Sequence, residues 1–561
     1  MKFSNKIISQ TITQLCHLKG IDHVVISPGS RNAPLTIGFS ESPLFTNFSI
    51  VDERSAAFFA LGMAQQLKKP IVLVCTSGSA LLNYYPAIAE AFYSNIPLIV
   101  ISADRPAELI DIGDGQTIRQ ENVFDNHILY SANCKEGKKH QDYNERVINK
   151  ALNSAFELQG PVHINIPFSE PLYETVDEIE MQFNNIPVSI SLDDFSEDIS
   201  SFVQQWTKSK KKMILIGVMD PNNIEHHYLD ILAKDKSVIV LTETTSNIHH
   251  ESFFPSIDQL IAPLEEDDFK DLQPDILLTF GGMVVSKKIK AFLRNYSPNQ
   301  HWHVNSKNAL NTYFVLKHHF KTSPNEFLRK FLLPSKIKEQ KTEKNIISYQ
   351  ANWLKIKEHR QNRHRSYEKE IPFSDFKVFS EIFKSIPLNI QLQLSNSTTI
   401  RYAQLFNLDT SLKVFCNRGT SGIDGCISTA IGAAQSSHHP TVLITGDIGF
   451  FYDSNALWNN YIPNDFKIIV INNKGGGIFR ILPDAKKAKH FDTFFETKHN
   501  YTAEHICSMF GFKYSFANDE LSLNIELNSL FEISEKPRLL EIFTPSNVND
   551  KILLDYFTFI K

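Results

Sequence analysis

The chain repeats one pattern near both of its ends, and this repeat constrains the fold more than any other feature of the sequence. Near the N-terminus the apolar run 71–75 ends in Thr-Ser-Gly, and a second apolar run, 98–101, follows after a helical stretch. Near the C-terminus the run 441–444 ends in Thr-Gly-Asp, and 468–471 follows in the same way. Short apolar runs that alternate with helices are typical of βαβ units and parallel sheets. The sequence therefore predicts two related α/β domains.

A third domain is expected between these two. Three further apolar runs, 213–217, 238–241 and 276–280, are enough for a sheet of their own. The length of 561 residues is also too great for a single hydrophobic core. Composition turns polar after Pro187 and again across the charged stretch 336–370, which marks the connectors. We predict domains at 1–187, 188–345 and 371–561, with a charged connector at 346–370.

Composition excludes several classes of protein. Hydrophobic residues make up 42% and charged residues 21% of the chain, and no apolar run reaches the roughly 18 residues that a membrane span requires. The first 20 residues lack the apolar core of a signal peptide, so a soluble cytoplasmic protein is predicted. The six cysteines form no Cys-x-x-Cys pair and are expected to be reduced. A net charge of -5 gives no general attraction to nucleic acid, and neither a nucleic-acid partner nor membrane insertion is expected.

The strongest chemical signal is Gly446-Asp447, followed 26 residues after the aspartate by Asn473 and then by Gly475. Each group follows a predicted strand, and the carboxyl ends of neighbouring parallel strands meet at one edge of a sheet. Carboxylate, amide and carbonyl oxygens suit Mg²⁺, which completes its coordination with phosphate oxygens. The pattern therefore predicts a site for a metal diphosphate. The alternative is that Asp447 caps a helix and the asparagines form a turn.

This pattern resembles the thiamine-diphosphate enzymes, which carry Gly-Asp-Gly and, some two dozen residues later, Asn-Asn. Ile448 stands here where most of those enzymes have the last glycine. The N-terminal domain supports the resemblance, because Glu53 in the run 51–57 lies between a predicted strand and a helix. There the family keeps the glutamate that bonds N1′ of the cofactor's aminopyrimidine and promotes its imino tautomer. Alternatively, Glu53 is only a favourable charge at a helix N-terminus.

A closer resemblance comes from three longer motifs: Ser-Pro-Gly-Ser-Arg-Asn-Ala-Pro-Leu at 27–35, Asn-Arg-Gly-Thr-Ser-Gly-Ile-Asp-Gly at 417–425 and Gly-Gly-Gly-Ile-Phe at 475–479. They resemble the 2-succinyl-5-enolpyruvyl-6-hydroxy-3-cyclohexene-1-carboxylate (SEPHCHC) synthase family of menaquinone biosynthesis, which tolerates a residue other than glycine after Gly-Asp. The resemblance implies three doubly wound parallel-sheet domains: pyrimidine-binding, central and diphosphate-binding. It also implies thiamine diphosphate with Mg²⁺ or Mn²⁺ as cofactors.

The same resemblance assigns roles to single residues. Glu53 is the catalytic residue, and Ile423 resembles the bulky residue that bends the cofactor. The cofactor-binding set is Glu53, Ile423, Gly446, Asp447, Asn473, Gly475, Ile478 and Phe479, and the metal ligands are Asp447, Asn473 and Gly475. Since the family forms its sites between subunits, we expect a homo-oligomer, either dimer or tetramer. In it Glu53 of one chain acts with Asp447 and Asn473 of another.

The substrates implied by the family are 2-oxoglutarate and isochorismate, both dicarboxylates, so their site needs several cations, preferably arginines. The substrate-binding set is Ser30, Arg31, Arg105, Gln116, Lys287, Lys288, Asn396, Ser397, Arg401, Arg418 and Leu482. Lys288 departs from the family, which usually has arginine there. Ile478, Phe479 and Leu482 are expected to form an apolar wall that excludes water. Taken singly, each cation could also be an ordinary solvated surface residue.

Other functions fit the sequence less well. Another thiamine-diphosphate enzyme, either a 2-oxoacid decarboxylase or an acetohydroxyacid-synthase-like carboligase, would share Glu53 and Asp447 but not the cations. A nicotinamide dehydrogenase would need Gly-x-Gly-x-x-Gly after a strand, and the glycines at 113–115 and 475–477 lack the third glycine. A nucleotide-binding scaffold would show no turnover. The histidine pairs 226–227, 249–250 and 301–303 have no third ligand at a suitable spacing for a metal.

Overall fold

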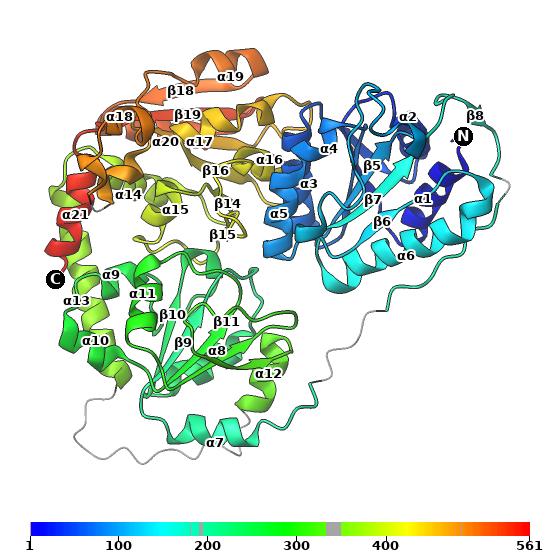
Figure 1. Ribbon diagram of the computed structural model, residues 1–561. Helices are drawn as coiled ribbons and strands as arrows, with labels where there is room; N and C mark the ends of the chain where they lie inside the picture. The colour runs from blue at the N-terminus through cyan, green and yellow to red at the C-terminus, as the bar shows by residue number, and fades with distance from the viewer. Residues whose placement is uncertain (1, 180, 190–194, 333–348, 483) are drawn as a thin grey trace.

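The computed structural model describes residues 2–179, 181–189, 195–332, 349–482 and 484–561. It has three lobes (Figure 1). The N-terminal lobe (blue and cyan) and the C-terminal lobe (yellow to red) lie side by side, and the central lobe (green) lies below the C-terminal one. β8 (Thr175–Val176) is the last strand before the central lobe, and α7 (Ser200–Lys208) is the first helix of that lobe.

The N-terminal lobe is built on a six-stranded parallel sheet in the order β3-β2-β4-β5-β7-β6. Its strands are β2 (His23–Ile26), β3 (Thr46–Ser49), β4 (Ile71–Cys75), β5 (Leu98–Asp104), β6 (Ser131–Asn133) and β7 (Val162–Pro167). Its helices are α1 (Ile7–Leu18), α2 (Ala33–Ser40), α3 (Glu53–Leu67), α4 (Ser79–Asn83), α5 (Tyr85–Ser94), η1 (Ala107–Leu109), η2 (Asp125–His127), η3 (Lys138–His140) and α6 (Gln141–Leu158). β1 (Phe3–Ser4) pairs with β8 in a separate antiparallel ribbon.

The C-terminal lobe has a six-stranded parallel sheet in the order β15-β14-β16-β17-β19-β18. Its strands are β14 (Gln391–Leu394), β15 (Lys413–Phe415), β16 (Thr441–Gly446), β17 (Lys467–Asn472), β18 (Lys513–Ala517) and β19 (Arg538–Phe543). Its helices are α14 (Asp375–Ser385), α15 (Thr398–Ala403), α16 (Cys426–Ser436), α17 (Asp447–Tyr452), η5 (Ser454–Leu457), η6 (Gly477–Ile481), η7 (Ala485–Lys487), α18 (Phe491–Phe494), α19 (Glu504–Phe510), α20 (Glu520–Leu530) and α21 (Asn549–Phe559). Numbered along the chain within each sheet, both terminal lobes have the strand order 2-1-3-4-6-5, so the repeat predicted from the sequence is confirmed.

The central lobe holds the predicted third sheet, which is five-stranded and parallel in the order β10-β9-β11-β12-β13. Its strands are β9 (Lys212–Ile216), β10 (Val238–Thr242), β11 (Ile276–Phe280), β12 (Gln300–Val304) and β13 (Leu316–Phe320). Its other helices are α8 (His226–Lys234), η4 (Thr244–Ser246), α9 (Ile257–Ile261), α10 (Glu266–Leu272), α11 (Lys287–Asn295) and α12 (Pro324–Phe331). α13 (Tyr349–Glu370) leads from this lobe into α14. Part of the predicted connector region, residues 333–348, lies outside the described residues.

The two terminal lobes are joined by close contact between α3 and α16 (Figure 1). A Cβ atom on Gly62 would lie 2.0 Å from the carbonyl oxygen of Thr429, and one on Gly432 would lie 1.9 Å from that of Phe59. Only glycine permits this approach of two helix backbones. The contact places the start of α3, where Glu53 lies, next to the chain that follows α17, because Asn455 donates a hydrogen bond to Asp52 (2.8 Å).

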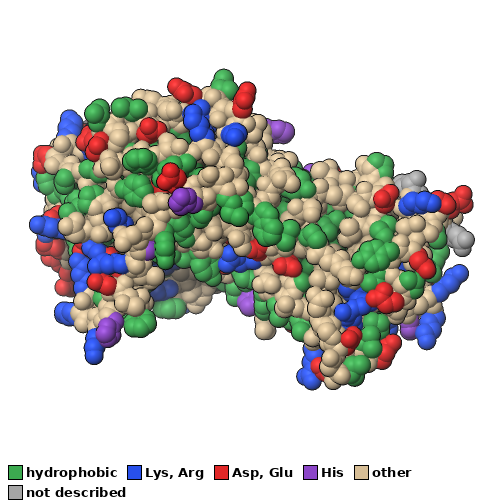
Figure 2. All heavy atoms as spheres, turned by 90° about the horizontal axis from the view of Figure 1, so that it is seen from above, with side chains coloured by type: hydrophobic (Ala, Val, Ile, Leu, Met, Phe, Trp, Pro, Cys, Tyr) green, Lys and Arg blue, Asp and Glu red, His purple; other side chains and the backbone are tan. Residues whose placement is uncertain are grey.

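The remaining features are those of a folded α/β protein. All six cysteines are buried and unpaired. In the part of the chain that the structure describes, no helix combines the length and the apolar character that crossing a bilayer requires. On the face shown in Figure 2, acidic and basic side chains are interspersed over both lobes that it displays. Of the histidines considered as ligands, His301 and His303 both hydrogen-bond Thr279 Oγ1, at 2.9 and 2.8 Å.

Candidate active site

The carboxyl edge of the C-terminal sheet brings the predicted metal-binding groups together. β16 and β17 are neighbouring parallel strands, with Gly446 opposite Ile471. Asp447 follows β16 as the first residue of α17, and Asn473 follows β17 directly. Both side chains belong to buried residues, with exposures of 3% and 8%. The adjacency expected from two strand ends is therefore present.

The Asp447 carboxylate is held by the backbone around it. Its Oδ1 accepts a hydrogen bond from Ile448 N (2.7 Å), and its Oδ2 accepts one from Gly475 N (2.9 Å). His499 Nε2 lies 3.2 Å from the same Oδ2. These contacts fix the carboxylate and connect it to the turn that carries Gly475.

The side-chain oxygen of Asn473 accepts no hydrogen bond from the described residues. Its Nδ2 donates to Asp375 Oδ2 (2.9 Å), whereas its Oδ1 is buried and has no hydrogen-bond partner among the described residues. Burial raises the pKa of the Asp375 carboxyl to about 6, and the nearby Asp447 charge also raises it, against hydrogen bonds from Thr544 and Asn473 that lower it. A buried unpaired oxygen beside a carboxylate is the kind of group that binds a cation.

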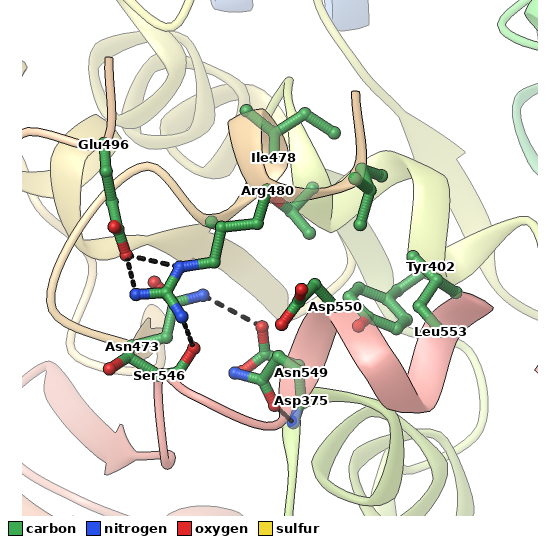
Figure 3. A pocket seen from close by; sticks show the side chains of 13 residues that line it. Asp375, Tyr402, Asn473, Ile478, Arg480, Glu496, Ser546, Asn549, Asp550 and Leu553 are labelled. Atoms are coloured by element: carbon green, nitrogen blue, oxygen red, sulfur yellow. Dashed lines mark hydrogen bonds and ion pairs between the residues drawn. The ribbon is translucent and has the colours of Figure 1, made fainter. Parts of the chain in front are cut away.

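The backbone conformation at position 475 requires glycine. Its φ is +149°, and a Cβ at this position would lie 2.7 Å from the carbonyl oxygen of Glu496. That carbonyl accepts a hydrogen bond from Gly476 N (2.6 Å), so the turn packs directly on the segment around Glu496. The Glu496 side chain is itself paired with Arg480, whose Nε lies 2.6 Å from Oε1 (Figure 3).

A pocket of about 220 Å³ lies over these groups; we call it the Asp447 pocket. The pocket is lined by segments 395–399, 445–449 and 495–497 and by Asp375, Phe379, Ile423, Ile471, Asn473, Gly475, Gly476, Ile478 and Phe479. Ile423, Ile478 and Phe479 are therefore among the residues that line this pocket. Leu482 is not among the lining residues; it follows η6 and is 41% exposed. The pocket combines hard oxygen donors with apolar walls, which suits a metal diphosphate attached to an organic ring.

Three predicted cations come together where the central lobe meets the C-terminal lobe. Lys288 is the second residue of α11, Arg401 lies on α15 and Arg418 follows β15; we call them the cationic cluster. Lys288 and Arg401 both act electrostatically on the buried carboxyl of Asp258, and Arg401 and Arg418 on each other. Residues more than a hundred positions apart in the chain thus form one basic region.

Two acids that were not predicted, Glu243 and Asp258, lie near this cluster and bind the start of α11. Burial raises the pKa of Glu243 to about 7, although its carboxylate accepts hydrogen bonds from Val285 N (2.6 Å) and Ser286 N (2.8 Å). Burial also raises the pKa of Asp258, which accepts a hydrogen bond from Ser286 Oγ. Both acids therefore hold the start of α11, where Lys287 and Lys288 lie exposed. No motif in the sequence marks them.

Asn396 and Ser397 lie beside the arginines. The Asn396 amide donates to Asn417 O and Gly422 O, both at 2.7 Å, and its Oδ1 accepts from Arg418 Nη1 at 2.7 Å. Its hydrogen-bonding groups are thus engaged within the chain. Ser397 lines the Asp447 pocket with a φ of +72°, which is unusual for serine, and its carbonyl accepts from Arg401 Nη1 (2.7 Å).

The N-terminal residues occupy the carboxyl edge of their own sheet. Glu53 begins α3, whose N-cap Asp52 accepts a hydrogen bond from Ser55 N (3.1 Å). The Glu53 side chain is half-buried, and burial together with the Asp52 charge raises its pKa. None of the residues 1–187 is among those lining the Asp447 pocket, so in a single chain Glu53 and Asp447 belong to separate edges.

The other N-terminal candidates surround this edge. Arg31 is 7% exposed, donates to Phe168 O (2.8 Å) and lies 3.1 Å from Glu170 Oε1. Arg105 Nη2 donates to Gly115 O (3.0 Å). Ser30 and Gln116 are exposed. Both arginines thus already have partners in the chain.

Comparisons with known proteins agree with this arrangement. Residues 7–128 match the family described as thiamine pyrophosphate enzyme, N-terminal TPP binding domain, residues 196–393 match the middle domain, and residues 397–542 match the C-terminal TPP binding domain. A curated protein of Christiangramia forsetii named 2-succinyl-5-enolpyruvyl-6-hydroxy-3-cyclohexene-1-carboxylate synthase is 55% identical over 100% of both chains. Proteins of the same name from Flavobacterium psychrophilum and Porphyromonas gingivalis are 56% and 37% identical, covering 98% and 100% of this chain and 98% of each relative.

Proposed function

Because the chain belongs to the SEPHCHC synthase family of thiamine-diphosphate-dependent enzymes, we propose that it decarboxylates 2-oxoglutarate and joins the remaining four-carbon unit to isochorismate. This reaction is a carboligation, carried out by a transferase, in menaquinone biosynthesis. The full-length similarity to curated synthases supports it over the alternative of another thiamine-diphosphate decarboxylase or carboligase.

The Asp447 pocket fits the cofactor. We assign Asp447, the Oδ1 of Asn473 and the carbonyl of Gly475 to Mg²⁺, or Mn²⁺ in its place, because these are oxygen donors and the Asn473 oxygen lacks a partner in the described chain. When bound, thiamine diphosphate supplies the carbon centre that stabilises the negative charge left by decarboxylation. Gly446 and Ile423 lie against the same pocket and complete the cofactor-binding set.

The chain's own residues then bind, orient and protect the reactants. The cationic cluster, with Lys287, binds carboxylates, and arginine is suited to this because its planar group makes two parallel hydrogen bonds. Asn396 orients Arg418 through the bond to its Nη1. Ser397 lines the Asp447 pocket, and its carbonyl accepts a hydrogen bond from Arg401 Nη1. Ile478 and Phe479 line the pocket with apolar surface and exclude water, whereas Leu482, at the end of η6, lies outside the residues that line it.

The catalytic glutamate must come from a second copy of the chain. Glu53 and the surrounding Ser30, Arg31, Arg105 and Gln116 lie on the edge of the N-terminal sheet, and the Asp447 pocket contains none of them. We therefore assign Glu53 to hold the proton shared with the pyrimidine N1′ atom in the site of a partner chain. Burial raises the pKa of Glu53, which favours the protonated form of this carboxyl. The proposal thus includes a cytoplasmic homo-oligomer, dimeric or tetrameric.

The single observation that carries the proposal is the buried Oδ1 of Asn473, which has no partner among the described residues and lies beside Asp447 in a pocket with apolar walls. The test is to incubate the purified chain with thiamine diphosphate, Mg²⁺, 2-oxoglutarate and isochorismate and to analyse the products by mass spectrometry. We expect one adduct whose mass is the sum of both substrates less carbon dioxide. Release of carbon dioxide without an adduct would favour a decarboxylase instead, and 2-oxoglutarate alone serves as the control.

A further inference from the structure

Two successive asparagines follow β17, and each is held by a buried acid. Asn472 Nδ2 donates to Glu541 Oε1 (2.7 Å), and Asn473 Nδ2 donates to Asp375 Oδ2 (2.9 Å). Glu541 and Asp375 are 0% and 2% exposed. Since an ionised carboxylate can only accept hydrogen bonds, it selects the NH₂ end of each amide. Each acid therefore fixes which way its asparagine points.

The two amides differ at their oxygen ends. Asn472 is satisfied within the chain, because its Oδ1 accepts from Lys474 N (3.1 Å) and its Nδ2 donates also to Tyr501 O (3.0 Å). The Oδ1 of Asn473 is buried without a hydrogen-bond partner in the described parts of the chain. Asn473 also lines the Asp447 pocket, whereas Asn472 does not. Only the second asparagine thus has an oxygen left for a ligand.

Asp375 is itself placed firmly. It is the first residue of α14, after the N-cap Ser374. Its Oδ1 accepts from Thr544 Oγ1 (2.6 Å), and its backbone N–H donates to Asn549 Oδ1 (2.9 Å). Figure 3 shows Asp375, Asn549 and Asn473 converging from three separate segments, with the dashed bond joining Asp375 to Asn473. A helix start and the loop after β19 thus hold the carboxylate in place.

We propose that Asp375 is the positioning residue of the metal site: it fixes the Asn473 amide so that its oxygen, and not its NH₂ group, faces the Mg²⁺ ion shared with Asp447. This inference rests on the proposed function, in which Asn473 is a metal ligand. If the amide turned over, its NH₂ group would face the cation and its oxygen would face a carboxylate, so both contacts would become repulsive. Groups behind metal ligands orient the ligands in this way.

The test is Asp375→Asn in the full-length chain, with Mg²⁺ titrated against thiamine diphosphate binding by calorimetry. We expect the Mg²⁺ concentration needed for binding to rise about 10- to 100-fold, the usual effect of losing such a partner. Glu541→Gln is the matched control, because it removes the same charge behind Asn472 and should leave the Mg²⁺ requirement unchanged. Thermal unfolding without Mg²⁺ and cofactor shows whether each variant is folded. A similar rise in both variants would overturn the inference.

Two further variants separate this inference from the proposed function. Asn473→Ala should weaken Mg²⁺ binding, and adding Asp375→Asn to it should weaken binding no further, since Asp375 acts through Asn473. If Asn473→Ala has no effect, the metal assignment fails. If Asn473→Ala weakens binding but Asp375→Asn does not, or if their effects add, only the role of Asp375 fails. Should Asp375→Asn not fold, Thr544→Val removes the bond to Asp375 Oδ1 and should weaken Mg²⁺ binding; an unchanged requirement would also overturn the inference.

Discussion

The N-terminal and C-terminal lobes share one strand order but differ in the chemistry of their carboxyl edges. The N-terminal edge carries Glu53 with Arg31 and Arg105, whereas the C-terminal edge carries the oxygen donors Asp447 and Asn473. The strand order therefore places both groups of residues but does not determine what either does, since function depends on the loops at the edge. In the proposed function the N-terminal edge supplies the proton-transferring acid and the C-terminal edge supplies the metal site. The comparison thus leads to the proposal that the two lobes are complementary halves, and the predictions below test it.

Glu53→Gln should have the largest effect, because it keeps the shape of the N-terminal edge and removes its only proton-transferring group in the proposed mechanism. Activity should fall by about 10²- to 10⁴-fold in steady-state assays, while Mg²⁺ and cofactor binding at the C-terminal edge persist. Asp52→Asn is the control: it removes a neighbouring charge but keeps the N-cap of α3, which asparagine also provides. Near-normal turnover in Glu53→Gln would contradict the assignment of proton transfer to the N-terminal edge.

Asp447→Ala should weaken the binding of metal and cofactor at the C-terminal edge, whereas Glu53→Gln should leave that binding intact. Losing a group behind a metal ligand costs about 10- to 100-fold in affinity, so losing a ligand should raise the Mg²⁺ requirement at least that much. The requirement for thiamine diphosphate should rise with it, because the ion connects protein and diphosphate. Calorimetric titration measures both. Unchanged cofactor affinity would contradict the assignment of this edge.

Mixing the two kinds of mutant tests whether the halves come from different chains. Glu53→Ala and Asp447→Ala proteins, each inactive, are dissociated, mixed in equal amounts and reassociated. Random pairing makes about half of the dimers mixed, and one of the two sites in each mixed dimer has both wild-type residues. About a quarter of wild-type activity should therefore return. If verified subunit exchange restores none, Glu53 and Asp447 serve the same chain's site or one of them is misassigned.

Lys288→Arg should have the smallest effect. It tests whether the cationic cluster, unlike the paired arginines of the N-terminal edge, is free to bind a substrate. Arg31 is already paired with Glu170, whereas Lys288 is exposed, with its Nζ 5.2 Å from the centre of the Phe557 ring. Arginine offers two parallel hydrogen bonds where lysine offers a point charge, so the KM for isochorismate should fall by about two- to fivefold. Decarboxylation of 2-oxoglutarate alone should not change. Lys270→Arg, on exposed α10, is the control, and equal effects on both substrates would argue against contact with isochorismate.

The sequence was sufficient for the parts of the site that follow strands directly. Asp447 and Asn473 come immediately after apolar runs, and neighbouring parallel strands place such residues at one edge whatever the rest of the fold does. The repeat predicted two lobes of one kind for the same reason. The positions of Gly475 and Ile423 came from family motifs, and the structure places both at the Asp447 pocket.

The residues that sequence reasoning missed are those brought in by tertiary contacts. Asp375 begins a helix 98 positions before Asn473, and nothing around it in the sequence indicates that its carboxylate faces that amide. Asp258 and Glu243 likewise become recognisable only when the central lobe packs against the C-terminal lobe. Leu482 was expected in the apolar wall, but it follows the end of η6, is largely exposed and stands outside the residues lining the pocket.

By itself, the sequence determined the α/β class, the two related lobes, the family and the residues at the strand ends, because periodicity and motifs act over short stretches of chain. The tertiary structure decided which of these residues share a site. It separated Glu53 from Asp447 within one chain, gathered Lys288, Arg401 and Arg418 around buried acids, and set the direction of the Asn473 amide. Such arrangements depend on burial and on partners far away in the sequence, and neither is encoded in the residues next to a motif.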